Sequence, residues 1–173
     1  SQAEHDKLAS ALLITDSATL AKEVACELEI QVNKLPRKEI AEASLKANCK
    51  IILTDNLSVA VELSNEYAPE HLELCVKQPF ELLKKVKNAG SVFLGYNTPE
   101  AVGDYYAGAN HTLPTSGTSR FSSPLGVDDF IKTTQYVYYT KPALQSAAED
   151  ITSFALSEGL TAHAESVYKR VKQ

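Results

Sequence analysis

The sequence has no methionine and little cysteine. Because its 173 residues include no initiator and open on Ser1, we expect the chain to be part of a longer protein. The three cysteines, Cys26, Cys49 and Cys75, form no Cys-x-x-Cys pair. This argues against a disulfide framework and against a zinc site made of thiolates. We therefore expect three reduced, buried cysteines that pack as small residues.

Excess positive charge and long apolar runs are also lacking. The formal net charge is −5 at pH 7, so the chain has no basic surface of the kind that binds nucleic acid. No apolar run is long enough to span a bilayer, and no charged-then-apolar leader opens the sequence. We expect neither a nucleic-acid nor a membrane partner, and a cytoplasmic location.

Short apolar runs alternate with amphipathic segments along the first half of the chain. The apolar runs predict buried strands at residues 11–14, 50–53, 72–76 and 91–94. Helical patterns lie between them: one capped by Asp16 or Ser17, one from Pro36 to about Asn48, one capped by Asp55 or Asn56, and one from Pro79 to about Gly90. This alternation predicts an α/β fold, an incomplete Rossmann-like parallel sheet with helices on both faces. The dinucleotide fingerprint G-x-G-x-x-G is absent.

The pattern changes after Gly95. Asn97, with Glu100 three residues later, resembles a capping box at the start of a helix. Residues 108–126 are rich in Gly, Ser, Thr and Pro and predict a long loop, which is usually functional or disordered. A strand is expected at 135–139, followed by helices at 142–157 and 161–172.

These patterns predict an α/β domain at residues 1–122 and a C-terminal helical segment at 123–173. The two C-terminal helices form a small hairpin, which cannot bury much surface by itself. We therefore expect the hairpin to pack on this domain or on a second subunit.

His5 and His71 each lie within three residues of another side chain that could bind a metal or accept a proton. His5 follows Gln2 by three residues, so both share a face if the segment is helical, and zinc accepts imidazole nitrogen and amide oxygen. The alternative is a frayed terminus. His71 follows Glu70 where a strand begins, and the pair can provide two proton acceptors. The alternative is a surface acid beside a histidine at the strand edge.

The other two histidines lie near later acids. Asp104 precedes the long loop, and His111 lies within it, near glycines that let the backbone approach a ligand. Glu158 and His163 flank the break between the last two helices. A helix-surface acid, a helix cap and a surface histidine are the plainer interpretations. Together, the four histidines at element ends indicate a site assembled from distant segments.

Six segments resemble those of histidinol dehydrogenases, in the order and spacing of that family. They extend from the first residue to His163: residues 1–6 (SQAEHD), 65–72 (NEYAPEHL), 90–95 (GSVFLG), 103–105 (GDY), 108–115 (GANHTLPT) and 160–163 (LTAH). The resemblance implies oxidation of L-histidinol to L-histidine, through L-histidinal, in two NAD-dependent steps at the end of histidine biosynthesis.

The resemblance also implies roles for particular residues. Those that match zinc ligands are Gln2, His5, Asp104 and His163, and those that match proton acceptors are Glu70 and His71. Substrate contacts are implied for Gln2, His5, His71, Asp104, Glu158 and His163, and His111 matches a histidine near the substrate. The family's zinc site joins two subunits of a homodimer, with the C-terminal histidine crossing from the partner.

The chain also departs from the family pattern. The family has a long upstream region, expected to hold NAD, that is missing from this sequence, so we expect the 173 residues alone to be inactive. Ser119 stands where alanine is usual, and residues 124–126 also differ. Two alternatives remain open: a non-catalytic zinc-binding or dimerisation module, and an unrelated α/β metallohydrolase that uses Asp104 and the histidines.

Overall fold

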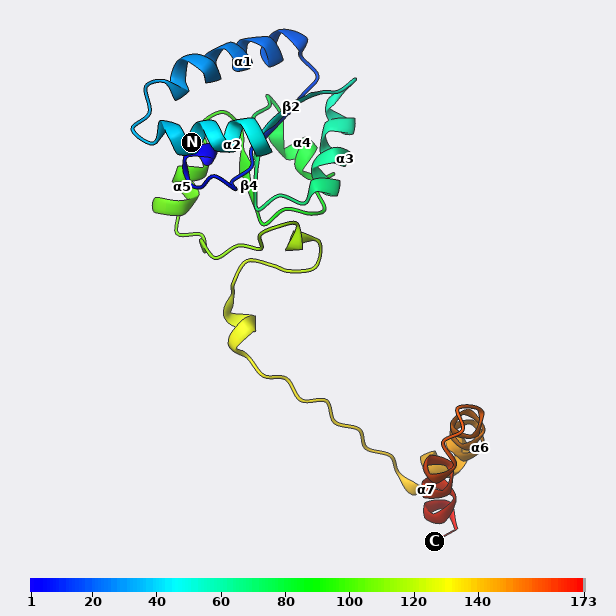
Figure 1. Cartoon of the computed structure of the whole chain (residues 1–173). Helices are drawn as coiled ribbons and strands as arrows, with labels where there is room; N and C mark the ends of the chain where they lie inside the picture. The colour runs from blue at the N-terminus through cyan, green and yellow to red at the C-terminus, as the bar shows by residue number, and fades with distance from the viewer. Residues whose placement is uncertain (173) are drawn as a thin grey trace. The chain divides into compact units, whose positions relative to one another are not determined.

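The computed structural model describes residues 1–172 and divides after Phe130 into two compact units (Figure 1). The first unit, Ser1–Phe130, carries the strands, and the second, from Ile131 onward, carries a pair of helices. The division falls later in the chain than the 122/123 boundary expected from the sequence.

The first unit alternates strands and helices. Its elements are η1 (Gln2–Glu4), β1 (Leu12–Thr15), α1 (Ala18–Val32), α2 (Lys38–Asn48), β2 (Lys50–Leu53), α3 (Leu57–Tyr67), β3 (His71–Leu74), α4 (Pro79–Leu83), β4 (Ser91–Leu94), α5 (Glu100–Tyr105), η2 (Thr118–Arg120) and η3 (Val127–Phe130). The predicted α/β class is confirmed, and all four predicted strands form within two residues of their expected bounds.

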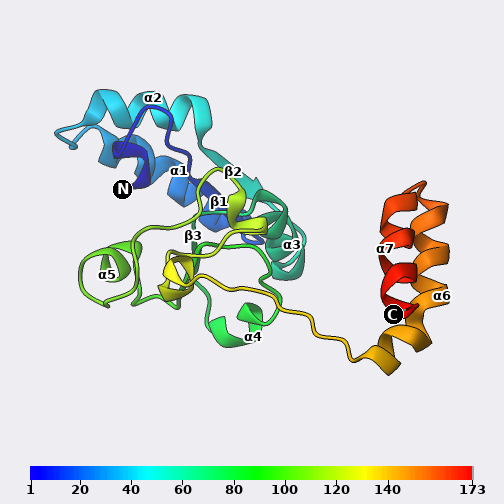
Figure 2. The ribbon, with the colours of Figure 1, turned by 90° about the horizontal axis from the view of Figure 1, so that it is seen from below.

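The strands pair in parallel, as the alternation with helices predicts. β1 pairs with β2, with Leu12 opposite Lys50, and β3 pairs with β4, with His71 opposite Ser91. They form two separate two-stranded sheets within the described residues, instead of one four-stranded sheet. Helices pack against them: α1 contacts β1 and β2, α3 contacts β1, and α4 contacts β3 (Figure 2).

A small apolar cluster fixes the N-terminal turn onto the rest of the first unit. Ala3, in η1, is buried together with Val32 and Ala41, and Leu35, Leu45 and Cys49 pack around them. The Arg37 guanidinium also donates a hydrogen bond to the His5 carbonyl oxygen at 3.1 Å. The segment that carries Gln2 and His5 is therefore held in place by packing and is not a frayed end.

α4 is shorter than expected. It ends at Leu83, whereas the sequence predicted a helix to about Gly90. The Asn65 side chain replaces the missing helical hydrogen bonds: its Nδ2 donates to the Lys85 carbonyl at 2.9 Å, and its Oδ1 accepts from the Lys87 N–H at 2.7 Å. A distant amide, which local patterning does not reveal, therefore stops this helix.

The second unit is a helical hairpin made of α6 (Lys141–Ser157) and α7 (Thr161–Val171), as expected. Gly159, with φ of +74°, forms the turn, and the Leu160 N–H bonds to the Ala155 carbonyl at 2.8 Å. The strand expected at 135–139 is wrong, because residues 131–140 are irregular and exposed, without a strand to pair with. Within residues 1–172, no helix is both long and apolar enough to cross a membrane.

The cap of α3 gives a test of the fold. Asn56, one of the two cap candidates, accepts hydrogen bonds from Ser58 N–H at 2.9 Å and Val59 N–H at 3.1 Å. We expect Asn56→Ala to destabilise the chain by about 1 kcal/mol, because these donors lose their acceptor. Thermal unfolding should show a lower Tm for Asn56→Ala, with Asp55→Ala as the matched control near wild type. Equal effects of the two substitutions would contradict the assignment of the cap.

Gly103 gives a second test. A Cβ at Gly103 would lie 2.6 Å from Cε1 of Phe93, whose side chain is buried. In a helix, alanine is favoured over glycine by up to about 1 kcal/mol, but overpacking a core costs about 1–3 kcal/mol. We therefore expect Gly103→Ala to be net destabilising. Gly126→Ala, whose Cβ meets nothing closer than 3.9 Å, is the control, and a Gly103→Ala chain more stable than wild type would refute the packing argument.

Candidate functional site

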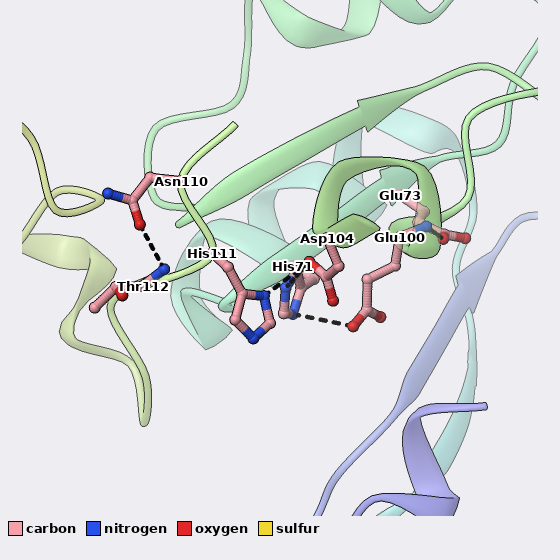
Figure 3. Close-up of polar contacts among 7 residues, drawn as sticks. All are labelled: His71, Glu73, Glu100, Asp104, Asn110, His111 and Thr112. Atoms are coloured by element: carbon pink, nitrogen blue, oxygen red, sulfur yellow. Dashed lines mark hydrogen bonds and ion pairs between the residues drawn. The ribbon is translucent and has the colours of Figure 1, made fainter. Parts of the chain in front are cut away.

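The centre of the site is a nearly buried histidine between two carboxylates (Figure 3). His71 Nδ1 lies 3.8 Å from Glu100 Oε1, and His71 Nε2 lies 3.8 Å from Asp104 Oδ1. The exposed fractions of these side chains are 13% for His71, 20% for Glu100 and 9% for Asp104. Glu100 and Asp104 are four residues apart on α5, so both lie on the helix face turned toward β3.

The turn before β3 fixes where Glu70 and His71 lie. α3 ends at Ala68, which is buried in the left-handed conformation with φ of 55°, and Pro69 follows. Gly90 N–H donates to the Pro69 carbonyl at 2.9 Å, and Ser91 N–H donates to the Glu70 carbonyl at 2.8 Å. This close approach requires glycine, since a Cβ at Gly90 would lie 2.6 Å from the Glu70 oxygen. The backbone of Glu70 is thereby tied to β4, directly before His71.

α5 is anchored to β3 beside the histidine. The Glu100 N–H, at the first residue of α5, donates to Glu73 Oε1 at 2.8 Å (Figure 3). Glu73 and His71 are two residues apart on β3 and so share one face of the strand. On that side the His71 ring also contacts the ring of Phe93, with centroids 5.9 Å apart.

Glu100 is the residue that the sequence interpretation missed. It was expected to complete a capping box with Asn97, but α5 begins at Glu100 itself, with Pro99 as cap residue and no side-chain cap bond. Its carboxylate faces His71 instead. The available signal was its spacing from Asp104, because acids at positions i and i+4 of a helix share a face.

His111 joins the site from the loop after α5. Its Nδ1 lies 3.1 Å from Asp104 Oδ1, while its side chain is 69% exposed. Asn110 shapes the loop there, with Oδ1 accepting from Thr112 N–H at 2.8 Å and Nδ2 donating to the Leu125 carbonyl at 2.5 Å. Asp104 therefore has two imidazoles beside one carboxylate oxygen.

The remaining predicted site residues lie elsewhere on the chain. Gln2 and His5 are in and directly after η1, which lies on the same side of the first unit as α5 (Figure 1, Figure 2), but no described contact joins them to Asp104. Glu158 is the C-cap residue of α6, and His163 is exposed in the first turn of α7. Both belong to the second unit. Of the predicted site residues, the described contacts of the first unit bring together His71, Asp104 and His111, and Glu100 joins them.

One set of donors lies close enough together to hold a metal ion, the resemblance implies a second set, and Asp104 belongs to both. The ligand atoms of His71, Glu100 and Asp104 lie within 4.8 Å of one another. The other set is the one implied by resemblance, Gln2, His5, Asp104 and His163. It gains support from Gln2, whose buried Oε1 has no hydrogen-bond partner among the described residues. A buried acceptor without a donor is costly unless it binds a cation, and amide, imidazole and carboxylate donors all suit zinc.

The three cysteines are free, but the expectation that they are buried is wrong for Cys26 and Cys75, which are exposed. Cys75 directly follows the strand that carries His71. It lies two residues after Glu73, with its Sγ 3.8 Å from Glu73 Oε2. Partial burial raises the pKa of the Cys75 thiol, and the neighbouring carboxylate raises it further. A raised pKa lowers the fraction of nucleophilic thiolate, which argues against a nucleophilic role for Cys75.

The chain matches the sequence model of the histidinol dehydrogenase family over residues 1–171. It is 53% identical to the histidinol dehydrogenase of Clostridium acetobutylicum over 172 residues, which are 99% of this chain and 40% of that protein. It is 55% identical to the histidinol dehydrogenase of Caldanaerobacter subterraneus subsp. tengcongensis over 170 residues, again 40% of that protein.

A solved structure is also similar. The crystal structure of histidinol dehydrogenase from Elizabethkingia anophelis superimposes with a TM-score of 0.82 and 37% identity, over 98% of this chain and 39% of that one. The chain thus spans about 40% of the length of the curated relatives it matches. Because the family match covers nearly every residue, this chain belongs to the histidinol dehydrogenase family.

Proposed function

We propose that these residues supply the proton-transfer and metal-binding part of an enzyme that oxidises L-histidinol to L-histidine with NAD. The observation that carries the proposal is the placement of His71, nearly buried beside Asp104 and directly after Glu70. A nearly buried imidazole with adjacent carboxylates suits a general base near neutral pH. Since the chain covers about 40% of its relatives, we propose that the residues that bind NAD lie in the remaining length.

In the first step, His71 accepts the proton of the substrate alcohol. Its Nε2 is buried without a hydrogen-bond partner among the described residues, so a lone pair is available there. As the proton moves to His71, the alcohol carbon loses hydride, and the alcohol becomes the aldehyde L-histidinal.

In the second step, Glu70 accepts a proton from water. The resulting hydroxide adds to the aldehyde carbon and gives the anion of the hydrate. This anion transfers a second hydride to NAD and releases its remaining hydroxyl proton to solvent, which leaves the carboxylate of L-histidine. The two hydrides together remove four electrons, which requires two molecules of NAD. Glu70 suits this role because its backbone is held by the Ser91 N–H immediately before His71.

Gln2, His5 and Asp104 would hold zinc together with His163 from a second copy of the chain. Bound there, zinc would supply a Lewis acid with an affinity for nitrogen ligands, the kind of group that the amine and imidazole of the substrate offer. The orphaned Gln2 Oε1 and the nearly buried Asp104 carboxylate support this donor set. Glu158 is proposed to contact the substrate, as are the zinc-binding residues and His71. Exposed apolar side chains on α6, among them Phe154 and Leu156, support a homodimer.

A second candidate is a non-catalytic zinc-binding or dimerisation module. The buried Gln2 Oε1 and the nearly buried Asp104 carboxylate would serve such a metal site equally well. For both candidate functions, we expect the 173 residues alone not to reduce NAD with histidinol and to show no saturable NAD binding. The candidates differ for a chain of the relatives' full length, which turns over only if the dehydrogenase assignment is correct. The metallohydrolase alternative is set aside by the family match.

The two acceptors can be separated by following the two steps in a chain of the relatives' full length. We expect His71→Asn to lower kcat for histidinol by about 10²–10⁴-fold, because the alcohol proton loses its acceptor. Glu70→Gln should leave the first hydride transfer intact and slow the oxidation of histidinal. Stopped-flow formation of NADH from each substrate measures both effects.

The matched control for Glu70→Gln is Glu62→Gln, an exposed glutamate on α3. It should leave both steps unchanged. Full turnover of histidinol by His71→Asn would discard the assignment of the base, and an equal loss of both steps in Glu70→Gln would discard the division of roles.

The metal content of variants tests which donor set binds zinc. After dialysis, elemental analysis should find zinc lost from Asp104→Asn and from Gln2→Ala, but retained by Glu100→Gln and His71→Asn. Asp6→Asn, an acid next to His5, is the control and should retain zinc. Loss of zinc from Glu100→Gln and His71→Asn, with retention in Gln2→Ala, would assign the ion to the other donor set instead.

A further inference from the structure

We propose that Glu100 is a positioning residue for His71: it holds the proton on Nδ1 and thereby leaves Nε2 as the atom that accepts the substrate proton. This inference rests on the proposed function, because it gives a role to the partner of the proposed base. Neither the family match nor the resemblance read from the sequence assigns any function to Glu100.

The first argument is the arrangement of partners around the imidazole. Glu100 Oε1 lies on the Nδ1 side of the ring, at 3.8 Å, and Asp104 Oδ1 lies on the Nε2 side (Figure 3). A neutral imidazole carries one proton, and the nitrogen that faces a dedicated acceptor keeps it. Asp104 Oδ1 also lies 3.1 Å from His111 Nδ1, and Asp104 is a proposed zinc ligand. Among the described residues, Glu100 forms an ion pair with His71 alone. The Nδ1 proton is therefore the one with an acceptor to itself.

The second argument is that Nε2 of His71 is the ring nitrogen that can accept a proton from the substrate. It is buried and lacks a hydrogen-bond partner among the described residues. A distance of 3.8 Å is longer than a hydrogen bond, but contacts of catalytic groups in ligand-free structures are often long and tighten when substrate binds. A small movement of either side chain brings Nδ1 and Glu100 into bonding range.

The third argument is that Glu100 itself is held. Its N–H bonds to Glu73 Oε1 at 2.8 Å, and Glu73 lies on the same strand as His71. The Phe93 ring contacts the imidazole and limits its tilt. The strand that carries the base thus also holds, through Glu73, the backbone of the helix residue that faces the base.

The test compares four variants in a chain of the relatives' full length. Glu100→Gln keeps the shape of the side chain but removes its charge, and Glu100→Asp keeps the charge. We expect Glu100→Gln to lower kcat for histidinol by about 10–100-fold, as is usual when the group that orients a functional histidine is lost, with little change in KM and with zinc retained. Glu100→Asp should recover part of the loss. Glu81→Gln, an exposed glutamate in the first turn of α4, is the matched control.

The decisive variant is the double substitution His71→Asn with Glu100→Gln. If Glu100 acts only through His71, its removal costs nothing further once the imidazole is gone. An additional, independent loss in the double variant would overturn the proposal, as would wild-type kcat in Glu100→Gln. Loss of zinc from Glu100→Gln would overturn it too, since Glu100 would then be a ligand. Failure of the proposed function is distinguishable, because His71→Asn would then retain activity by itself.

Discussion

The parallel pairing of β3 with β4 is the constraint on which the site depends. It places His71 opposite Ser91 and ties the Glu70 carbonyl to the Ser91 N–H. Side chains alternate along a strand, so a shift of one residue would turn His71 and Glu73 to the other face, away from α5. Gly90 permits this pairing, because any side chain there would collide with the Glu70 carbonyl. The close contact of the Gly90 backbone with the Glu70 carbonyl therefore determines where the proposed base lies, although Gly90 itself takes no part in the reaction.

The short helix α5 depends on contacts with the rest of the first unit for its stability. Isolated helices of six residues do not form in water, so its contacts with β3 and β4 must hold it. Two of these contacts also shape the site: Glu73 accepts from the first N–H of α5, and Phe93 packs where Gly103 leaves room for its ring. Stability of α5 and correct placement of Glu100 and Asp104 are thus the same requirement.

The sequence reveals those features that are determined locally. Apolar runs predict the four strands, and Asn56 is recognisable as a possible cap because its neighbours begin an amphipathic helix. Local sequence patterns fail where a group far away in the sequence determines the structure. The end of α4 depends on Asn65, and the orientation of Glu100 depends on β3, neither of which is visible within a window of local sequence. The strand expected at 135–139 failed for a related reason, since aromatic residues favour a strand only where another strand is available to pair.

The charges at the site explain why a base and a metal are compatible there. Glu100 and Asp104 place two carboxylates beside one imidazole, and both have little contact with water. Nearby carboxylates that are shielded from solvent repel one another unless positive charge compensates them. A proton on His71 would compensate part of this charge, but it would occupy the nitrogen needed for the substrate proton. Under the proposed function, a divalent ion at Asp104 would supply positive charge instead, without occupying Nε2 of His71.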